Sequence, residues 1–236
     1  MGCFYNVRAI IKYNAGGNAK KPKEKETLYK ESKADYDKAI ERAPNIASFY
    51  YNRGITNDEL DDYDAAIADY GKAITLEPNY APCYYNRACA KLAIGDLKAA
   101  ADDFVRAGQL YADSDDFASA SGSFYNAYTH FESSDAYLGA AEANLHLENY
   151  VGAAGQLRRA KESDSSIAGD RRFKSMGQSL TIKLGVNITH LLDTPKQDNV
   201  PSANNYSQSA IEYKLKGAKM PAGDSDSLPS EIKKKK

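Results

Sequence analysis

Residues 47–80 read ASFYYNRGITNDELDDYDAAIADYGKAITLEPNY, and residues 81–114 read APCYYNRACAKLAIGDLKAAADDFVRAGQLYADS. The second stretch repeats the first at a period of 34 residues. Self-similarity at a fixed period in this range is typical of proteins built from stacked units, so this pair of stretches decides the fold class. Such arrays usually bind other chains, and neither copy contains a recognisable active site.

Large and small residues recur at matching places in the two copies. With each copy numbered from 1 to 34, positions 4, 8, 17, 20, 24, 27 and 32 hold Tyr50, Gly54, Tyr63, Ala66, Tyr70, Ala73 and Pro78 in the first and Tyr84, Ala88, Leu97, Ala100, Phe104, Ala107 and Ala112 in the second. Small residues let two helices approach closely, aromatic residues fill the space around them, and proline ends the second helix. This order resembles the tetratricopeptide repeat, a helix-turn-helix unit.

The resemblance implies an all-α fold, a right-handed superhelix of antiparallel helix pairs. We expect helices near residues 47–59, 62–76, 81–93 and 96–110, each with boundaries uncertain by a few residues.

The regions on either side extend the array. Residues 4–16 read like the first helix of each copy, which predicts an earlier repeat over residues 2–46. Its excess over 34 residues corresponds to GNAKKPKEKET, residues 17–27, which we interpret as an inserted loop because it is rich in Gly, Lys and Pro without apolar periodicity. A further repeat is predicted over residues 134–167, so that the array covers residues 1–167.

A helix over residues 115–131 interrupts the strict alternation of first and second helices. Either it reverses the direction of everything after it, or it pairs with residues 134–147 as an atypical hairpin. Residues 168–192 are predicted to form a capping helix, whose stripe of Phe173, Met176 and Leu180 covers the last repeat. Residues 193–236 lose apolar periodicity and end in four lysines, which predicts a disordered tail.

The composition excludes several classes of protein. The net charge is −1 and the isoelectric point is about 6.3, so nucleic-acid binding is not expected. No run of apolar residues is long enough for a membrane span, and the N-terminus has no recognisable secretory signal. The three cysteines form no even framework, which favours reduced thiols and a cytoplasmic location.

Nothing in the sequence indicates catalysis. The three histidines are isolated, and no phosphate-binding loop, dinucleotide-binding motif or hydrolase motif is present. We therefore expect no catalytic residues, no metal site and no cofactor, and we interpret the chain as a non-enzymatic protein.

An arginine and an aspartate recur together in the first three copies. Position 7 holds Arg8, Arg53 and Arg87, and position 23 holds Asp35, Asp69 and Asp103. The fourth copy lacks both residue types. We predict an ion-pair ladder near the seams between successive repeats, because the arginine fork holds carboxylates well. The alternative is that the arginines bind an acidic ligand.

In the family, the first helices of the repeats line a concave groove that holds a peptide or helix of a partner. Transferred by position, the resemblance implies groove residues Asn6, Ile10, Tyr13, Tyr51, Asn52, Ile55, Tyr85, Asn86, Cys89 and Leu92. Tyrosines are good anchors, and asparagine amides can pair with a peptide backbone. Family members that clamp the C-terminal carboxylate of chaperones need a lysine where this chain has Ser48, so that role is disfavoured.

The sequence thus predicts a protein-interaction module or scaffold, whose partner is a protein or peptide. One alternative is a regulatory or assembly subunit that acts through its lysine-rich tail. Another is a membrane-tethered scaffold acylated at Gly2 and Cys3, although Asn6 stands where the acylation motif has Ser or Thr.

Overall fold

The computed structural model describes residues 2–185, and residues 1 and 186–236 lie outside the described part. The predicted tail, residues 193–236, and the last residues of the predicted capping segment are therefore not described. The chain divides into two compact units, residues 1–139 and 140–236, and each is considered by itself.

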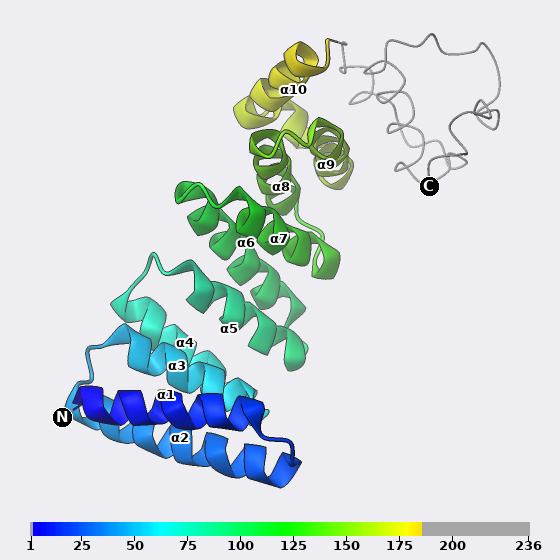
Figure 1. The fold of residues 1–236 in the computed structure, drawn as a ribbon. Coiled ribbons are helices and arrows are strands. Elements are labelled where there is room, and N and C mark those ends of the chain that lie inside the picture. The colour runs from blue at the N-terminus through cyan, green and yellow to red at the C-terminus, as the bar shows by residue number, and fades with distance from the viewer. Residues whose placement is uncertain (1, 186–236) are drawn as a thin grey trace, which may run out of the picture. The chain divides into compact units, whose positions relative to one another are not determined.

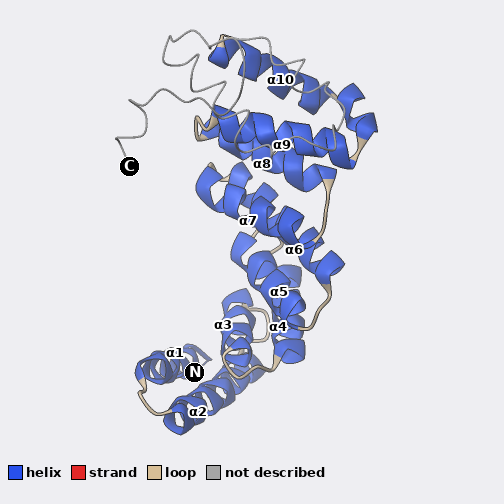
Figure 2. Cartoon of the chain, turned by 90° about the vertical axis from the view of Figure 1, so that its right-hand side faces the viewer, coloured by secondary structure: helices blue, strands red, loops and turns tan. Residues whose placement is uncertain are grey.

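The described residues form helices and no strands (Figures 1 and 2). The helices are α1 (Gly2–Asn18), α2 (Pro22–Arg42), α3 (Ala47–Asp58), α4 (Tyr63–Leu76), α5 (Ala81–Ala93), α6 (Leu97–Asp113), α7 (Phe117–His130), α8 (Ser134–His146), α9 (Tyr150–Ser163) and α10 (Arg171–Leu184), with a 3-10 turn η1 (Ser165–Gly169) before α10. The all-α fold is confirmed, and the helices expected within residues 47–114 correspond to α3–α6.

Close approach of a glycine and an aromatic ring holds the first regular hairpin together. A Cβ atom added at Gly54 in α3 would lie 2.6 Å from the ring of Tyr70 in α4, and that ring is fully buried. No side chain larger than hydrogen fits between the helix and the ring. Ala66 and Ala73, one turn to either side of Tyr70, are also fully buried. The alternation of small and large residues in the sequence is therefore the packing pattern of the hairpin.

The turns that follow α3, α5, α6 and α8 have the same backbone form, which the α1–α2 turn does not share. One residue at position 15 takes a positive φ angle: Asp61 at 58°, Gly95 at 83°, Asp115 at 60° and Glu148 at 58°. Three of the helices that follow begin with a side-chain cap, in which Asp96, Asp116 or Asn149 accepts a hydrogen bond from a backbone N–H of the first turn.

The recurrence of this turn at Asp115 shows how α7 is accommodated. It places α6 and α7 in a second register, residues 101–134, with Phe104 at position 4, Gly108 at 8 and Phe124 at 24. A Cβ added at Gly108 would lie 2.8 Å from the Phe124 ring, which is the same kind of close approach as that between Gly54 and the Tyr70 ring. Helix α6 therefore serves as the second helix of one hairpin and the first helix of the next, and α7 pairs with α6.

The inserted loop predicted over residues 17–27 is wrong. Helix α1 continues to Asn18 and α2 begins at Pro22, so only residues 19–21 lie between them. The extra residues lengthen the two helices to 17 and 21 residues, compared with 12 and 14 in α3 and α4. Proline is well tolerated in a first helical turn, and the lysines and glutamates that follow it are good helix formers.

The lengthened ends of α1 and α2 pack as the hairpin core does. Tyr29 is 2 % exposed, and a Cβ added at Gly16 would lie 2.6 Å from its ring. The Tyr13 ring stacks on the Tyr29 ring with centroids 5.3 Å apart. The sequence pattern missed this packing because a single aromatic residue in a lysine-rich stretch carries no periodicity.

In the second unit, η1 and α10 pack against α9. The stripe predicted from the sequence, Phe173, Met176 and Leu180, is buried. Gly185 takes a positive φ angle of 62° and ends α10. Glu142 of α8 accepts a hydrogen bond from Arg172 at 2.7 Å.

Candidate functional site

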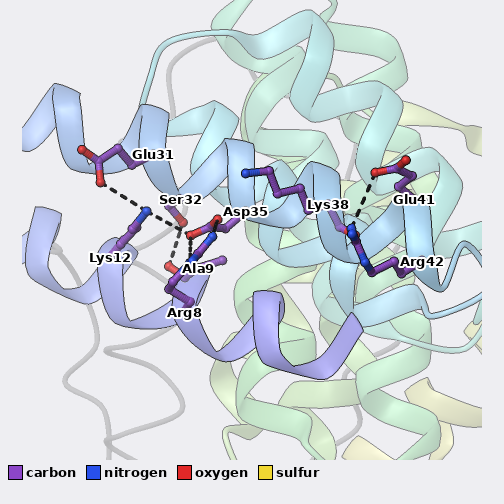
Figure 3. A network of polar contacts seen from close by, with 9 residues as sticks. All are labelled: Arg8, Ala9, Lys12, Glu31, Ser32, Asp35, Lys38, Glu41 and Arg42. Carbon is purple, nitrogen blue, oxygen red and sulfur yellow. Dashed lines mark hydrogen bonds and ion pairs between the residues drawn. The ribbon is translucent and has the colours of Figure 1, made fainter. Parts of the chain in front are cut away.

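The arginines of position 7 bind the aspartates of position 23 inside each hairpin. Arg53 donates to Asp69 from Nε at 2.8 Å and from Nη2 at 2.5 Å, and Arg87 donates to Asp103 from the same two atoms at 2.7 Å each. Arg8 makes the same paired contact with Asp35, with Nε at 2.7 Å (Figure 3). We expected these pairs at the seams between repeats. They lie within hairpins because positions 7 and 23 occupy the facing sides of paired helices.

A second donor reaches each of these aspartates from position 11. Lys12 lies 3.0 Å from Asp35 and Lys91 lies 2.7 Å from Asp103, and Asn57 donates to Asp69 at 3.0 Å. All three aspartates are at most 6 % exposed. The hydrogen bond from Arg8 lowers the pKa of the Asp35 carboxyl below its ordinary value. These contacts favour a structural role for the arginines over the binding of an acidic ligand.

Tyr51, a predicted anchor on α3, is largely engaged within the chain. Its ring lies edge-on to Tyr80 at 5.1 Å and tilted against Tyr70 at 6.0 Å. Its hydroxyl accepts a hydrogen bond from Asn86 of α5 at 3.3 Å. Two residues assigned to the groove therefore bind each other and link adjacent first helices.

Tyr85, the second predicted anchor, lies on α5 beside a pocket. Its ring packs edge-on against Phe104 at 5.2 Å, and its hydroxyl accepts a hydrogen bond from Asn126 of α7 at 3.1 Å. The pocket has a volume of about 340 Å³ and is open to solvent on one side. Its lining consists of Tyr85 from α5, Tyr111 from α6, and Ser119, Gly122, Ser123, Tyr125 and Asn126 from α7.

The floor and rim of this pocket differ in chemistry. Ser123 is fully buried, and its hydroxyl donates to the carbonyl of Ser119 at 2.8 Å. A Cβ added at Gly122 would meet nothing within 4 Å, so the glycine leaves open space. Tyr125 stands at the rim and is 56 % exposed. Burial raises the pKa of Tyr111 above its ordinary value.

Comparison with known proteins gives one family match, to the model described as tetratricopeptide repeat, over residues 47–80. This segment is a tetratricopeptide repeat. The next hairpin, residues 81–114, repeats its turn and its arginine–aspartate pair. No curated protein matches the sequence.

Solved structures of low sequence identity resemble the chain. The MamA protein is 19 % identical with a TM-score of 0.36, and the match covers 70 % of this chain and 96 % of that one. The TPR2AB domain of yeast Sti1, in its complex with pHSP90, is 16 % identical with a TM-score of 0.37, and the match covers 91 % of this chain and 96 % of that one. Yeast Tom70 is 17 % identical with a TM-score of 0.34, and the match covers 92 % of this chain and 56 % of that one.

The remaining groove residues of the tetratricopeptide repeats divide into two sets. Ile55 packs with Tyr51 against the buried ring of Tyr70, Leu92 packs on the cluster around Phe104, and Tyr13 stacks on Tyr29, so these fill the core. Ile10 and Cys89 are exposed, whereas Asn6 and Asn52 are half-buried. Part of the predicted set therefore fills the core, and the groove as a single binding surface stays a prediction.

The pocket residues on α7 were missed because helix 115–131 was treated as an interruption of the tetratricopeptide pattern. Small or polar residues at 119, 122, 123 and 126 follow one helical face, and this spacing could have indicated a surface that leaves space beside Tyr85.

Two further kinds of site were sought in the described part of the chain. Within residues 2–185, no group of three or more His, Cys, Asp or Glu side chains is arranged to hold a metal ion. None of the described helices combines the length and apolar character that crossing a bilayer requires.

Proposed function

We propose that this protein is a non-enzymatic interaction scaffold that binds a segment of a partner protein at the pocket between α5, α6 and α7. The observation that carries the proposal is the position of Tyr85, a predicted anchor that lies at an open pocket bounded by two more tyrosines. A volume of about 340 Å³ lies at the low end of the range for ligand pockets and suits one or two side chains of a peptide.

The chemistry of the lining supports a peptide ligand. Tyr85, Tyr111 and Tyr125 provide aromatic area with few rotatable bonds and polar tips, which is typical of residues that dominate binding energy. Asn126 and the serines offer donors and acceptors to a peptide backbone. Tyr51 and Asn86 bind each other, so we assign them to the spacing of α3 and α5, and we place the main anchor at Tyr85.

A pocket-filling substitution tests the proposal without removing any side chain that supports the fold. Gly122→Leu adds a side chain where nothing lies within 4 Å of the new Cβ, and it also removes a glycine from a helix interior. Peptides enriched from a displayed random library on the wild-type chain should bind Gly122→Leu at least about tenfold more weakly.

The matched control is Gly155→Leu in α9, where an added Cβ likewise meets nothing within 4 Å. This variant should bind the enriched peptides as the wild type does. If Gly122→Leu keeps full affinity while its helical circular dichroism is unchanged, the binding surface lies elsewhere and the proposal fails.

A further inference from the structure

The outer face of α1 is apolar and open. Phe4 is 63 % exposed, Val7 is 55 % exposed and Ile11 is 61 % exposed, and their spacing of three and four residues places them on one stripe of the helix. Ile10, at 37 %, adjoins this stripe. Single exposed apolar residues are ordinary, but a contiguous stripe of this kind marks an interaction surface.

The repeat register shows what kind of element fits there. Phe4 and Ile11 occupy positions 3 and 10 of their repeat. In α3 the same positions hold Phe49, 3 % exposed, and Thr56, fully buried. In α5 they hold Cys83, fully buried, and Ala90, 2 % exposed.

The reason for this difference is the neighbouring helix. Helix α2 packs on α3, and α4 packs on α5, whereas α1 has no helix before it in residues 2–185. A repeat buries its apolar face against its neighbour in the stack. The α1 stripe is therefore a stacking face that no helix of residues 2–185 covers, and α2 and α4 show that an α-helix packs on such a face.

Arg8 indicates the charge of the missing helix. Across the α2–α3 seam, Arg53 binds Asp69 in its own hairpin and uses Nη1 to bind Asp37 of the preceding helix at 2.7 Å. Arg8 binds Asp35 through Nε and Nη2, and its Nη1 makes no hydrogen bond to any group in the described residues. The Arg8 side chain is 40 % exposed, compared with 22 % for Arg53.

Further cations lie around Tyr5, the residue that follows Phe4. Arg8, Lys38 and Arg42 lie 5.2, 5.9 and 4.6 Å from the centre of the Tyr5 ring. Lys38 makes no ion pair within residues 2–185. Arg42 has the exposed Glu41 at 3.7 Å as its ion-pair partner and donates to the Lys38 carbonyl at 3.3 Å (Figure 3). Helix α1 itself contains no acidic residue. The helix that carries the stripe therefore supplies no carboxylate to these cations.

We propose that this face of α1 binds an acidic amphipathic helix of a partner protein. Its apolar side packs on Phe4, Val7 and Ile11 as α2 packs on α3. A carboxylate of the helix binds Arg8 Nη1, as Asp37 binds Arg53, and others lie near Lys38 and Arg42. This surface is separate from the pocket beside Tyr85 and gives the scaffold a second attachment point.

The charges of the chain argue against covering the face with its own segments. Two copies of α1 would offer no acidic residue to the Arg8 side chain of the other copy, because α1 contains none. The charged residues of α10 are all basic. Residues 186–236 contain more lysines than acidic residues. An acidic partner supplies the carboxylates that α1 and α10 lack, without the excess of lysines in residues 186–236.

The probe for the test is a synthetic helical peptide with leucines on one face and glutamates on both flanks, and the control peptide has lysines in place of the glutamates. Binding to the full chain is measured by fluorescence anisotropy. The acidic peptide should bind, and the lysine peptide should not.

Three variants locate the site. Phe4→Ser with Ile11→Ser should weaken binding of the acidic peptide at least about tenfold, because two apolar anchors are lost. Lys38→Glu should also weaken it. Ile182→Ser removes a side chain that is 79 % exposed on α10 and should change nothing. All altered side chains are exposed, and circular dichroism verifies the fold.

The pocket variant Gly122→Leu should bind the acidic peptide normally, so failure of this proposal and failure of the proposed function are distinguishable. Equal binding of the two peptides, or full affinity in the Phe4/Ile11 variant, overturns the proposal. The proposal is also overturned if a different occupant binds in a way that depends on Phe4 and Ile11. Such an occupant would be a second copy of the chain, seen as a dimer in sedimentation analysis, a phosphatidylserine vesicle, or a labelled peptide of residues 186–236.

Discussion

Arg53 and Asp69 form a two-point ion pair inside the α3–α4 hairpin, with Nε–Oδ2 and Nη2–Oδ1 distances of 2.8 and 2.5 Å. The carboxylate is 5 % exposed, so the pair lies at the edge of the core. The remaining Nη1 atom binds Asp37 of α2. One guanidinium therefore joins the two helices of its own repeat and also ties that repeat to the one before it.

Removal of Arg53 should be costly. Arg53→Met leaves a buried carboxylate with only the Asn57 amide as donor, and we expect a loss of about 3 kcal/mol in the free energy of unfolding. Urea denaturation measures it. The double variant Arg53→Met with Asp69→Leu should lose less than Arg53→Met alone, because no uncompensated charge remains. A loss below about 1 kcal/mol for the single variant would show that this pair contributes no more to stability than an exposed ion pair does.

Two glycine-to-alanine substitutions should act in opposite directions. At Gly54 the new methyl would lie 2.6 Å from the Tyr70 ring, which is fully buried, so Gly54→Ala should cost about 1–3 kcal/mol. At Gly122 the methyl meets nothing, and Gly122→Ala should gain about 0.5–1 kcal/mol from helix propensity. Chemical denaturation of both variants checks this. Equal shifts would show that close packing at Gly54 is unimportant.

Tyr29 should matter to stability even though its surroundings resemble a loop in the sequence. Its ring is 2 % exposed and stacks on Tyr13, so Tyr29→Ala should cost about 3 kcal/mol. Thr27→Ala, two residues away and exposed, should cost less than about 1 kcal/mol. Hydrogen exchange gives an independent check, since amides of residues 25–29 should be protected. Rapid exchange there would restore the loop interpretation.

Asp58 should make stability depend on pH. The Tyr70 hydroxyl donates to Oδ2, whereas Oδ1 is buried without a hydrogen-bond partner in the described part of the chain. Burial raises the pKa of this carboxyl to about 6, from an ordinary value of about 4. Between these values the folded chain holds a proton that the unfolded chain releases, so this group stabilises the fold less as the pH rises through about 4 to 6.

The substitution Asp58→Asn isolates this effect. It removes the buried charge and keeps an acceptor for Tyr70, so we expect a gain of about 1–2 kcal/mol over the wild type at pH 8 and almost none at pH 4. The control Asp102→Asn alters an exposed carboxyl on α6 and should show no such difference. Thermal melts of the wild type and both variants between pH 4 and pH 8 measure this gain in stability. A gain that is the same at both pH values would exclude a titrating Asp58.

Much of the first unit follows from the sequence, for a local reason. Gly54 and Tyr70 occupy facing positions because the helix period and the fixed length of the turn bring positions 8 and 24 together. The same geometry brings Arg53 to Asp69 and Arg87 to Asp103. A pattern that recurs every 34 residues therefore determines both the helices and the pairs within each hairpin.

Other features depend on which helix covers which face, and the repeat pattern does not specify this. Helix α6 serves two hairpins because Gly108 and Phe124 form a second tight contact outside the 34-residue register. The pocket beside Tyr85 is lined by Gly122 of α7, which has no side chain to fill the space.

The sequence by itself determined the helical repeats and the residue pairs that hold each hairpin, because those contacts join helices separated by one short turn. The tertiary structure alone decided the exposure of position 3, where Phe49 is 3 % exposed and Phe4 is 63 % exposed. The two phenylalanines occupy the same place in their repeats. Their burial differs because α2 precedes α3 and packs on it, whereas no helix of residues 2–185 precedes α1. Burial is a property of the neighbours that a residue has in space.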